Sequence, residues 1–464
     1  MSYQDSTQKD YFMFDSIDEI QQKIKQVNEK AGTIISSEEC QKIVNYYSTH
    51  LHQLCLKINL PESVIYTNLL LFKHFYLHQS PQLFHPRFIM VACICLGKKL
   101  EEFRYENEEN NQNIELVCHK LVESKALKLP VEQLKLFSLV YESVIFEVLH
   151  FQLGKFNAYG PYEGLLQDMI SWGINIEKSE LSENEMKTRE EFLSEFYSTG
   201  DKGEIILKKS YRDMSKKFMK NMYLTHVPFL YSPSLIALST HYSCFQQNHK
   251  EHFLQYLQSL KQKIVDKEID INVLERIINH VEKFETVSGG EIKKSVGKLD
   301  SIISISVLAY EDVHFREILN MSNGKYVNME SSIVQWHQNN DKWYQFWTPL
   351  QRIGKDEKEP YKVISPFLMK QARVIMFIFE EKRKESFDQL KQLLTMKKQY
   401  FDTENIIVVG INDENNPNVG LKEEQKQHVI NHLKNKIEMK AKYFQWNSSS
   451  SKMNDLIAAI DEFF

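Results

Sequence analysis

Lys98–Glu102 (KKLEE) places two amines and two carboxylates directly after an apolar helical turn. Groups of opposite charge at this spacing are suited to ion pairing, within the chain or with a partner. The preceding residues predict a helix over Phe88–Leu100, whose apolar stripe comprises Ile89, Cys93, Leu96 and Leu100. Lys99 lies at the edge of that stripe, where it can bury its stem and keep its amine available.

Other reactive groups do not form a recognisable catalytic or metal set. The chain lacks G-x-S-x-G, H-E-x-x-H and the kinase H-R-D and D-F-G motifs. His74, His78 and His85 lie close together, but no acid or cysteine completes a zinc site. The six cysteines include no C-x-x-C and are interpreted as small buried residues in a reducing compartment. We therefore expect no enzyme, no cofactor and no metal.

Composition indicates a globular protein of two or three domains. The chain has 464 residues, of which 42% are hydrophobic and 26% charged. A net charge of -5 argues against direct binding to nucleic acid. The sequence contains no apolar run long enough to cross a membrane and begins without an apolar signal segment, so neither a membrane nor secretion is expected.

The first 286 residues are predicted to be helical. Ser37, with two acids after it, and Pro61 are expected to begin helices, and another is expected from Val131. The charged stretch Glu177–Lys217 is interpreted as a solvated insertion or a charged helix pair, with a docking site as the less favoured alternative. Val287–Gly290 (VSGG) marks a boundary.

Beyond that boundary the sequence predicts an α/β sheet of parallel type. Apolar runs typical of buried strands occur at Ile302–Leu308, Val374–Phe379 and Ile406–Val409. Two alternating runs, Ser332–Gln338 and Lys342–Trp347, predict a hairpin about an Asn-Asn-Asp turn. Helices are expected between and after the strands, over Ser386–Tyr400, Lys422–Ile437 and Met453–Phe464.

Several motifs in the helical part, taken in order, resemble the tandem cyclin box family and more narrowly cyclin H. The first cyclin box is matched by Phe72–Leu77 (FKHFYL), His85–Arg87 (HPR) and Leu96–Phe103 (LGKKLEEF). Asn157–Gly164 (NAYGPYEG) resembles the link between two cyclin folds, and Leu230–Leu238 (LYSPSLIAL) resembles a motif of the second fold. The N-terminal segment and the helix expected over Ser16–Ala31 resemble the start of cyclin H.

The resemblance implies a set of kinase-binding residues. In cyclins the Lys at the end of the first-box helix pairs with a Glu on a later helix, and the pair reaches the kinase. Counting back from the L-x-F-x-L helix end at Leu149–Leu153 gives Glu142 as the partner of Lys99. The full implied set is Lys99, Glu142, Phe103, Tyr3, Phe12 and Phe14. The alternative is that Lys99 and Glu142 form only an intramolecular bridge between two helices.

The C-terminal part resembles a Rab-like small GTPase whose nucleotide chemistry is missing. Val374–Phe387 is similar to a strand and turn of that family, and Tyr443–Gln445 (YFQ) to its last motif. Where a phosphate loop would stand, Ala309–Arg316 (AYEDVHFR) has no glycine, no Lys followed by Ser or Thr, and two acids. Trp347–Gln351 and Ile411–Glu414 likewise lack the magnesium and guanine motifs. The resemblance therefore implies a P-loop-less pseudo-GTPase that acts in docking or packing.

The resemblance implies a non-catalytic cyclin H-like subunit that activates a cyclin-dependent kinase of the CDK-activating and transcription-factor-IIH type. The alternative is a scaffold subunit of a large assembly without a kinase, and a GTP-responsive regulator is the third hypothesis. Expected partners are the kinase, its assembly factor, and an unknown protein that binds the C-terminal domain. The expected location is nuclear, with a cytoplasmic or cytoskeletal assembly as the alternative.

The expected segments are an N-terminal extension and helix (1–36), a first cyclin fold (37–155), a second (156–286) with insertion 177–217, a linker (287–294) and the pseudo-GTPase domain (295–464).

Overall fold

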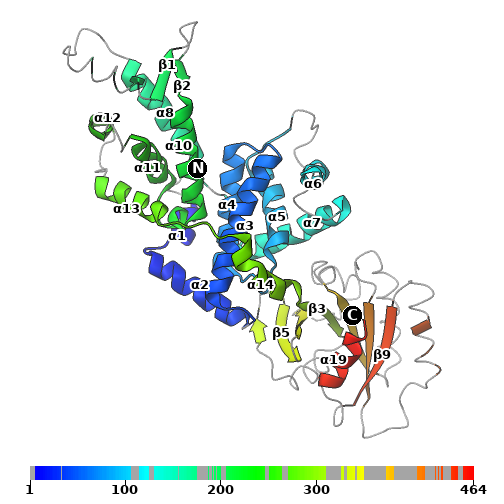
Figure 1. Cartoon of the computed structure of the whole chain (residues 1–464). Coiled ribbons are helices and arrows are strands. Elements are labelled where there is room, and N and C mark those ends of the chain that lie inside the picture. Colours follow the sequence, from blue (N-terminus) through cyan, green and yellow to red (C-terminus); the bar gives the residue numbers. More distant parts are fainter. Residues whose placement is uncertain are drawn as a thin grey trace. The chain divides into compact units, whose positions relative to one another are not determined.

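The computed structural model describes most of the helical part of the chain and the strands of its C-terminal part (Figure 1). The described residues are 6–32, 34–105, 114–124, 130–154, 156–174, 196–199, 205–245, 250–263, 270–309, 326–328, 332–339, 342–349, 372–380, 405–412, 440–447 and 453–463, with single residues within 187–194 and 424–431. They form two compact units. The helical unit comprises Met1–Asn28 and Ser37–Ile292, and the sheet unit comprises Glu29–Ser36 and Lys293–Phe464.

The first helical set of the helical unit is built around one fully buried helix. Its members are α3 (Ser37–Lys57), α4 (Glu62–His78), α5 (Pro86–Leu100), α6 (Ile114–Glu123) and α7 (Val131–Val148). Every residue of α4 from Val64 to Leu77 is buried, because α3, α5, α7, α8 and α10 all contact it. A helix that is buried on all sides occupies the centre of a bundle.

The prediction for α5 is confirmed in its C-terminal end, while its start lies two residues earlier, at Pro86. The His85 ring caps this start by accepting a hydrogen bond from the Arg87 amide at 3.2 Å. Three of the four stripe residues are buried as predicted, but Leu100 is 37% exposed, so its place in the buried stripe is corrected.

The N-terminal extension packs onto the helical unit through a small apolar cluster. It contains α1 (Thr7–Phe12) and α2 (Ile17–Ala31), and the latter confirms the helix predicted over Ser16–Ala31. Ile20 and Ile24 of α2 lie in one buried cluster with Leu77 of α4 and Phe229. This cluster therefore ties the extension to both helical sets at once.

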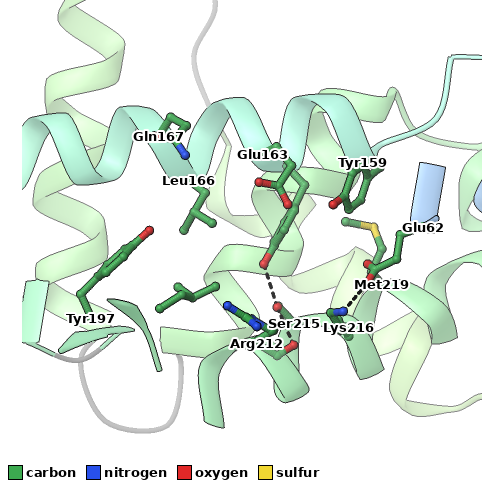
Figure 2. A pocket seen from close by; sticks show the side chains of 12 residues that line it. Glu62, Tyr159, Glu163, Leu166, Gln167, Tyr197, Arg212, Ser215, Lys216 and Met219 are labelled. Atoms are coloured by element: carbon green, nitrogen blue, oxygen red, sulfur yellow. Dashed lines mark hydrogen bonds and ion pairs between the residues drawn. The ribbon is translucent and has the colours of Figure 1, made fainter. Parts of the chain in front are cut away.

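The second helical set is interrupted by a short hairpin. Its elements are α8 (Tyr159–Ile174), β1 (Tyr197–Thr199), β2 (Ile205–Leu207), α10 (Lys209–Leu224), η2 (Val227–Phe229), α11 (Pro233–Phe245), α12 (Lys250–Lys263) and α13 (Ile271–Glu282). β1 and β2 pair antiparallel and, like the start of α10, lie in the charged insertion 177–217. Where described, the insertion contains helical residues as well as this hairpin, and part of it lines a pocket with α8 (Figure 2).

A buried lysine joins the two helical sets. Lys73 of α4 is 3% exposed, and its Nζ donates to the carbonyl oxygens of Leu224 and Thr225, each at 2.6 Å. These carbonyls end α10, where a cation is favoured by the helix dipole. Burial lowers the pKa of the Lys73 amine to about 7. Burial, with the nearby Lys73 charge, also lowers the pKa of His226.

We expect the helical unit to lose stability as the pH falls below 6.5, partly through His241 of α11. This side chain is fully buried, its Nδ1 accepts from the Tyr211 hydroxyl at 2.6 Å and its Nε2 donates to the Tyr162 carbonyl at 3.0 Å. Burial lowers the pKa of His241 to about 4. Between pH 6.5 and 4 the unfolded chain therefore binds a proton that the folded chain excludes, which favours unfolding as the pH falls.

At pH 5 this difference in proton binding lowers the free energy of unfolding by about 2 kcal/mol for one histidine. Urea unfolding of the chain and of His241→Gln at pH 7 and pH 5 measures it. The variant should be less stable at pH 7 and should lose less stability between the two values. An equal loss in both proteins would mean that His241 does not contribute to the acid sensitivity.

Gly289 and Gly290, which mark a boundary in the sequence, begin a helix in the structure. α14 spans Gly289–Asp300. Its start has the reciprocal hydrogen bonds of a capping box, from the Ser288 amide to Glu291 Oε1 at 3.1 Å and from the Glu291 amide to Ser288 Oγ at 3.4 Å. Ser and Glu three residues apart are the sequence signature of this motif. The passage from the helical to the sheet unit therefore occurs within a helix.

The sheet unit contains one seven-stranded mixed sheet. Its strands are β3 (Ile303–Ala309), β4 (Tyr326–Asn328), β5 (Ser332–Asn339), β6 (Lys342–Pro349), β7 (Val374–Glu380), β8 (Asn405–Asn412) and β9 (Lys440–Asn447). The order is β4-β5-β6-β3-β7-β8-β9. β6, β3, β7, β8 and β9 are mutually parallel, whereas β4, β5 and β6 pair antiparallel.

This sheet confirms the predicted strands and the predicted hairpin. Asn339 pairs with Lys342 across the expected turn, and β5 and β6 stay in register to Ser332 and Pro349. The last helix is also confirmed, as α19 (Met453–Asp461). The helix predicted over Ser386–Tyr400 lies outside the described residues, as does most of the one predicted over Lys422–Ile437.

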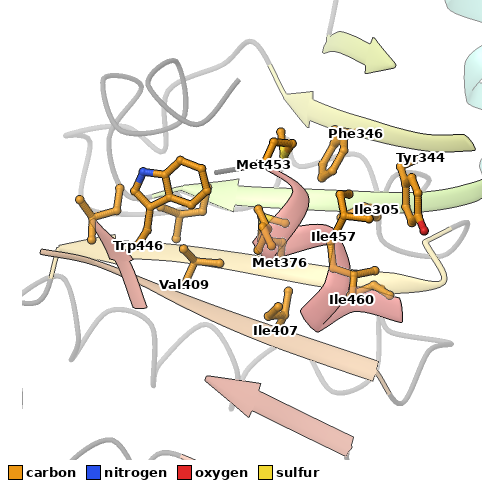
Figure 3. Close-up of a cluster of buried hydrophobic side chains, with 14 residues drawn as sticks. Ile305, Tyr344, Phe346, Met376, Ile407, Val409, Trp446, Met453, Ile457 and Ile460 are labelled. Atoms are coloured by element: carbon orange, nitrogen blue, oxygen red, sulfur yellow. The ribbon is translucent and has the colours of Figure 1, made fainter. Parts of the chain in front are cut away.

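One hydrophobic core holds α19 against the sheet (Figure 3). Met453, Leu456, Ile457 and Ile460 of α19 are buried with apolar side chains of β3, β6, β7, β8 and β9. Trp446 is the largest of the fully buried side chains in this core. The Tyr344 hydroxyl donates to Asp461 Oδ1 at 2.6 Å, which fixes the end of the helix on β6.

Candidate functional site

Lys99 and Glu142 form a half-buried ion pair between α5 and α7. Lys99 Nζ lies 2.7 Å from both carboxylate oxygens of Glu142. The Lys99 side chain is 27% exposed and that of Glu142 is 11% exposed. A partner protein can therefore reach the amine, while the carboxylate depends on it for compensation of its charge.

The two neighbouring lysines of α5 differ in burial. Lys98 is 2% exposed and lies over the ring of Tyr105, with Nζ 5.8 Å from the ring centroid. Lys99 faces the surface and Glu142. The apolar stripe places both residues near its edge, and packing around Tyr105 decides between them.

The end of α5 is held by a Schellman motif without glycine. The Phe103 amide donates to the Lys98 carbonyl at 3.1 Å, and the Glu102 amide donates to the Lys99 carbonyl at 3.2 Å. Glu102 adopts a φ of 51°, the left-handed conformation in which glycine is usual. The backbone around Lys99 is therefore fixed by a strained residue.

Polar contacts tie this helix end to the second helical set. Asn157 Nδ2 donates to Glu101 Oε1 at 3.1 Å and to Thr67 Oγ1 at 2.9 Å. Asn157 Oδ1 in turn accepts from the Tyr159 amide at 2.9 Å and so caps α8. The position of Lys99 thus depends on residues of both helical sets.

α4 and α5 approach each other closely at Gly97, in the last turn of α5. A Cβ at Gly97 would lie 1.8 Å from Asn68 Oδ1 and 3.0 Å from Asn68 Cγ. Asn68 is fully buried, and its Nδ2 donates to Cys55 Sγ at 3.5 Å. Glycine is required here because no side chain fits between the two helices.

Exposed apolar side chains occur on and just beyond the two helices that carry the ion pair. Leu100 follows Lys99, and Leu139, 52% exposed, lies one helical turn before Glu142. Phe151, just after α7, is 74% exposed with a φ of 59°. Such a conformation is rare for a bulky residue, and strain of this kind concentrates at functional sites. We call Lys99, Leu100, Leu139, Glu142 and Phe151 the α5–α7 surface.

Sequence reasoning identified the two charges of this surface and missed its apolar residues. The ring of Phe151 lies against that of Phe146, one turn after Glu142, with centroids 5.9 Å apart. The family motif at Leu149–Leu153 contains Phe151, but the sequence did not show that its ring faces solvent. The left-handed backbone of His150 and Phe151 turns the ring outward.

The remaining predicted residues lie in different places. Phe103 is partly exposed just beyond α5, with its ring against Tyr105 at 5.1 Å. Phe12 is 5% exposed, with its ring 3.9 Å from that of His74, and the Phe14 amide donates to the Phe229 carbonyl. These two hold the extension in place, and direct contact with a partner stays a prediction. Tyr3 lies outside the described residues.

The described residues also bear on the expected metal, cysteine and membrane features. No group of three His, Cys, Asp or Glu side chains among them is arranged to hold a metal ion. Five of the cysteines are buried, as predicted, and Cys244 is partly exposed. Within the described part of the chain, no helix combines the length and hydrophobicity needed to cross a bilayer. The segment that replaces the phosphate loop lies outside the described residues from Tyr310 onward.

The chain is similar in sequence to cyclins from several organisms. Cyclin-H of Xenopus laevis is 27% identical over 344 residues, which cover 70% of this chain and 94% of the relative. Cyclin mcs2 of Schizosaccharomyces pombe is 26% identical over 229 residues, which cover 49% of this chain and 56% of the relative. No family model matches the chain.

Two solved structures resemble the chain more distantly. One chain of the CAK complex from Chaetomium thermophilum bound to ATP-gamma-S has a TM-score of 0.44 and 12% identity, and covers 64% of this chain and 87% of its own length. One chain of the yeast TFIIK complex has a TM-score of 0.41 and 21% identity, and covers 62% of this chain and 100% of its own length.

Proposed function

We propose that this chain, which is related to cyclin H, is a non-catalytic regulatory subunit that binds and activates a cyclin-dependent kinase. The observation that carries the proposal is the ion pair of Lys99 and Glu142, set among exposed apolar residues of the α5–α7 surface. Apolar anchors around a partly desolvated charge pair are the composition of a protein-binding surface. By the resemblance to cyclins, we expect the pair at the position where a cyclin meets its kinase.

The proposed mechanism is a rearrangement of the kinase rather than chemistry by this chain. The α5–α7 surface packs on the αC helix of the kinase and sets the kinase's own Lys–Glu ion pair in its active geometry. Lys99 Nζ binds carbonyl oxygens of the partner while Glu142 holds the amine in place. Phe151 and Leu139 supply the apolar contacts, and Phe103 lies at the edge.

By the same relationship, we assign the chain to a CDK-activating or transcription-factor-IIH type of kinase assembly with a nuclear location. The Xenopus match supports this assignment because it extends over 94% of a cyclin H. An assembly factor is the expected third component. The contacts of Phe12 and Phe14 with the helical unit support a positioning role for the N-terminal extension in this complex.

Affinity purification of the native chain, followed by mass spectrometry and a kinase assay on the eluate, tests the proposal. A cyclin-dependent kinase in near-equimolar amount, with activity, is the expected result. A stoichiometric complex that contains no kinase would instead favour the scaffold function, in which Lys99 and Glu142 only join two helices.

For the sheet unit we propose a small-GTPase-like arrangement that acts in docking. Its support is the strand order, in which the first strand, β3, lies between β6 and β7 and the parallel strands continue to β9. In open sheets of this kind, ligands bind at the carboxyl ends of the central strands. β3 ends at Ala309, and the sequence from there to Arg316 has no glycine and contains Glu311 and Asp312, acids that repel phosphate.

We therefore expect no saturable binding of a guanine nucleotide to the full chain. Titration with fluorescent GTP, with and without magnesium, measures this. Both curves should stay linear up to high micromolar concentration. Magnesium-dependent binding in the micromolar range would contradict the docking proposal and favour a nucleotide-responsive regulator.

A further inference from the structure

A pocket of about 480 Å³ lies in the second helical set (Figure 2). α8 forms one side of it, α10 forms the other, and the hairpin β1–β2 closes one end. Tyr197, Leu207, Arg212 and Lys216 come from the charged insertion 177–217. The described part of the insertion therefore builds a cavity wall, a role that the kinase proposal does not use.

Each acid of this pocket has a polar partner within the chain. Glu62 forms an ion pair with Lys216. Glu163 of α8 accepts a hydrogen bond from Tyr159, and burial together with the Glu163 charge and this bond raises the pKa of Tyr159 to about 12. The hydroxyl is therefore protonated at neutral pH and remains the donor.

Arg212 is the cation of this pocket that has no acidic partner among the described residues. Figure 2 shows it projecting from α10, across from Glu163 on α8. A guanidinium keeps its charge at all physiological pH values and binds carboxylates through two parallel hydrogen bonds. The pocket thus presents, beside the rings of Tyr159 and Tyr197, an exposed guanidinium that is not held in an ion pair by the described residues.

The rest of α10 extends this positive charge along the surface. The helix carries five basic residues and one acid, Asp213, in a chain whose net charge is -5. Lys209, Lys216 and Lys217 are exposed. A basic helix that leads to a charged pocket attracts a negatively charged partner and fixes its register.

We propose that this pocket docks an acidic peptide segment of a partner protein. A carboxylate of the segment binds Arg212, and an apolar side chain beside it packs against Leu166 and Leu207. The lining favours a peptide because tyrosine and arginine are the residues that dominate protein-binding hot spots. The inference is independent of the kinase proposal, since its residues lie on α8, α10 and the hairpin rather than on α5 and α7.

Selection of random twelve-residue peptides displayed on phage tests the proposal. The full chain and its Arg212→Ala variant serve as parallel baits. Peptides enriched on the full chain should contain Asp or Glu beside an apolar residue, and they should be lost on the variant. Arg212 is exposed, so the variant should fold, and circular dichroism checks this.

Fluorescence anisotropy with the most enriched peptide then gives the size of the effect. Arg212→Ala should weaken binding about tenfold or more, the equivalent of one lost charge pair. Lys217→Ala removes the same charge from the same helix outside the pocket and should change affinity by no more than about twofold. Equal losses in both variants would mean non-specific attraction to α10. Enrichment of basic peptides, or no enrichment over the variant, would also overturn the proposal.

Discussion

Glu142→Ala is expected to weaken binding to the kinase by about 2–5 kcal/mol, roughly thirtyfold to several-thousandfold in Kd. The carboxylate holds Lys99 Nζ at 2.7 Å through both oxygens, and its side chain is only 11% exposed. Without it, the amine loses its position, and the complex buries a charge that has lost its partner. Titration of the purified kinase with the chain and with the variant, by calorimetry or anisotropy, measures the effect.

Two further variants separate binding from stability. Glu132→Ala removes an exposed acid of the same helix and should leave affinity unchanged. The charge swap Lys99→Glu with Glu142→Lys can restore the intramolecular pair but presents the wrong charge to the partner. We expect it to recover the stability of the helical unit and not the affinity. Full affinity in the swapped protein would show that the pair is only an intramolecular bridge.

Gly97→Ala is expected to lower the free energy of unfolding of the helical unit by about 2–3 kcal/mol. The new Cβ would lie 1.8 Å from Asn68 Oδ1, which is buried between α4 and α5 and cannot move into solvent. The two helices must separate, and the C-terminal turn of α5 moves with them. Urea unfolding followed by circular dichroism measures the loss.

Combining Gly97→Ala with Asn68→Ala tests whether the loss of stability comes from this steric clash. Asn68→Ala removes the two clashing side-chain atoms and leaves the Asn68 backbone nitrogen, 3.5 Å away, as an ordinary contact. The double variant should therefore be more stable than the sum of the single effects predicts. Gly164→Ala is the matched control, because its Cβ meets nothing within 4 Å, and it should stabilise α8 slightly. If the effects of Gly97→Ala and Asn68→Ala on the free energy of unfolding were strictly additive, the steric explanation would be excluded.

Much of the fold was predictable because it depends on local periodicity. Helical spacing of apolar residues located the end of α5 at Leu100, and the Asn-Asn-Asp turn located the hairpin of β5 and β6. The start of α14 was also readable, since Ser288 and Glu291 have capping-box spacing. It was missed because the two glycines after Ser288 suggested a loop.

The candidate sites were less predictable because they depend on backbone geometry and on distant segments. The exposure of Phe151 follows from two consecutive residues with positive φ. The pattern of side chains in the sequence does not predict this backbone conformation. Burial of Lys98 and exposure of Lys99 depend on Tyr105. The pocket around Arg212 combines α8, a hairpin and α10, which are separated by charged sequence without periodicity. Motif reasoning could therefore identify the ion pair and not the surfaces beside it.

The most direct test of the central claim is the activity of the isolated kinase partner before and after addition of the full chain. Phosphorylation of a peptide substrate should rise strongly and saturate at one chain per kinase, and Glu142→Ala should require a much higher concentration for the same activity. A kinase that binds the chain and shows unchanged activity would contradict the regulatory function.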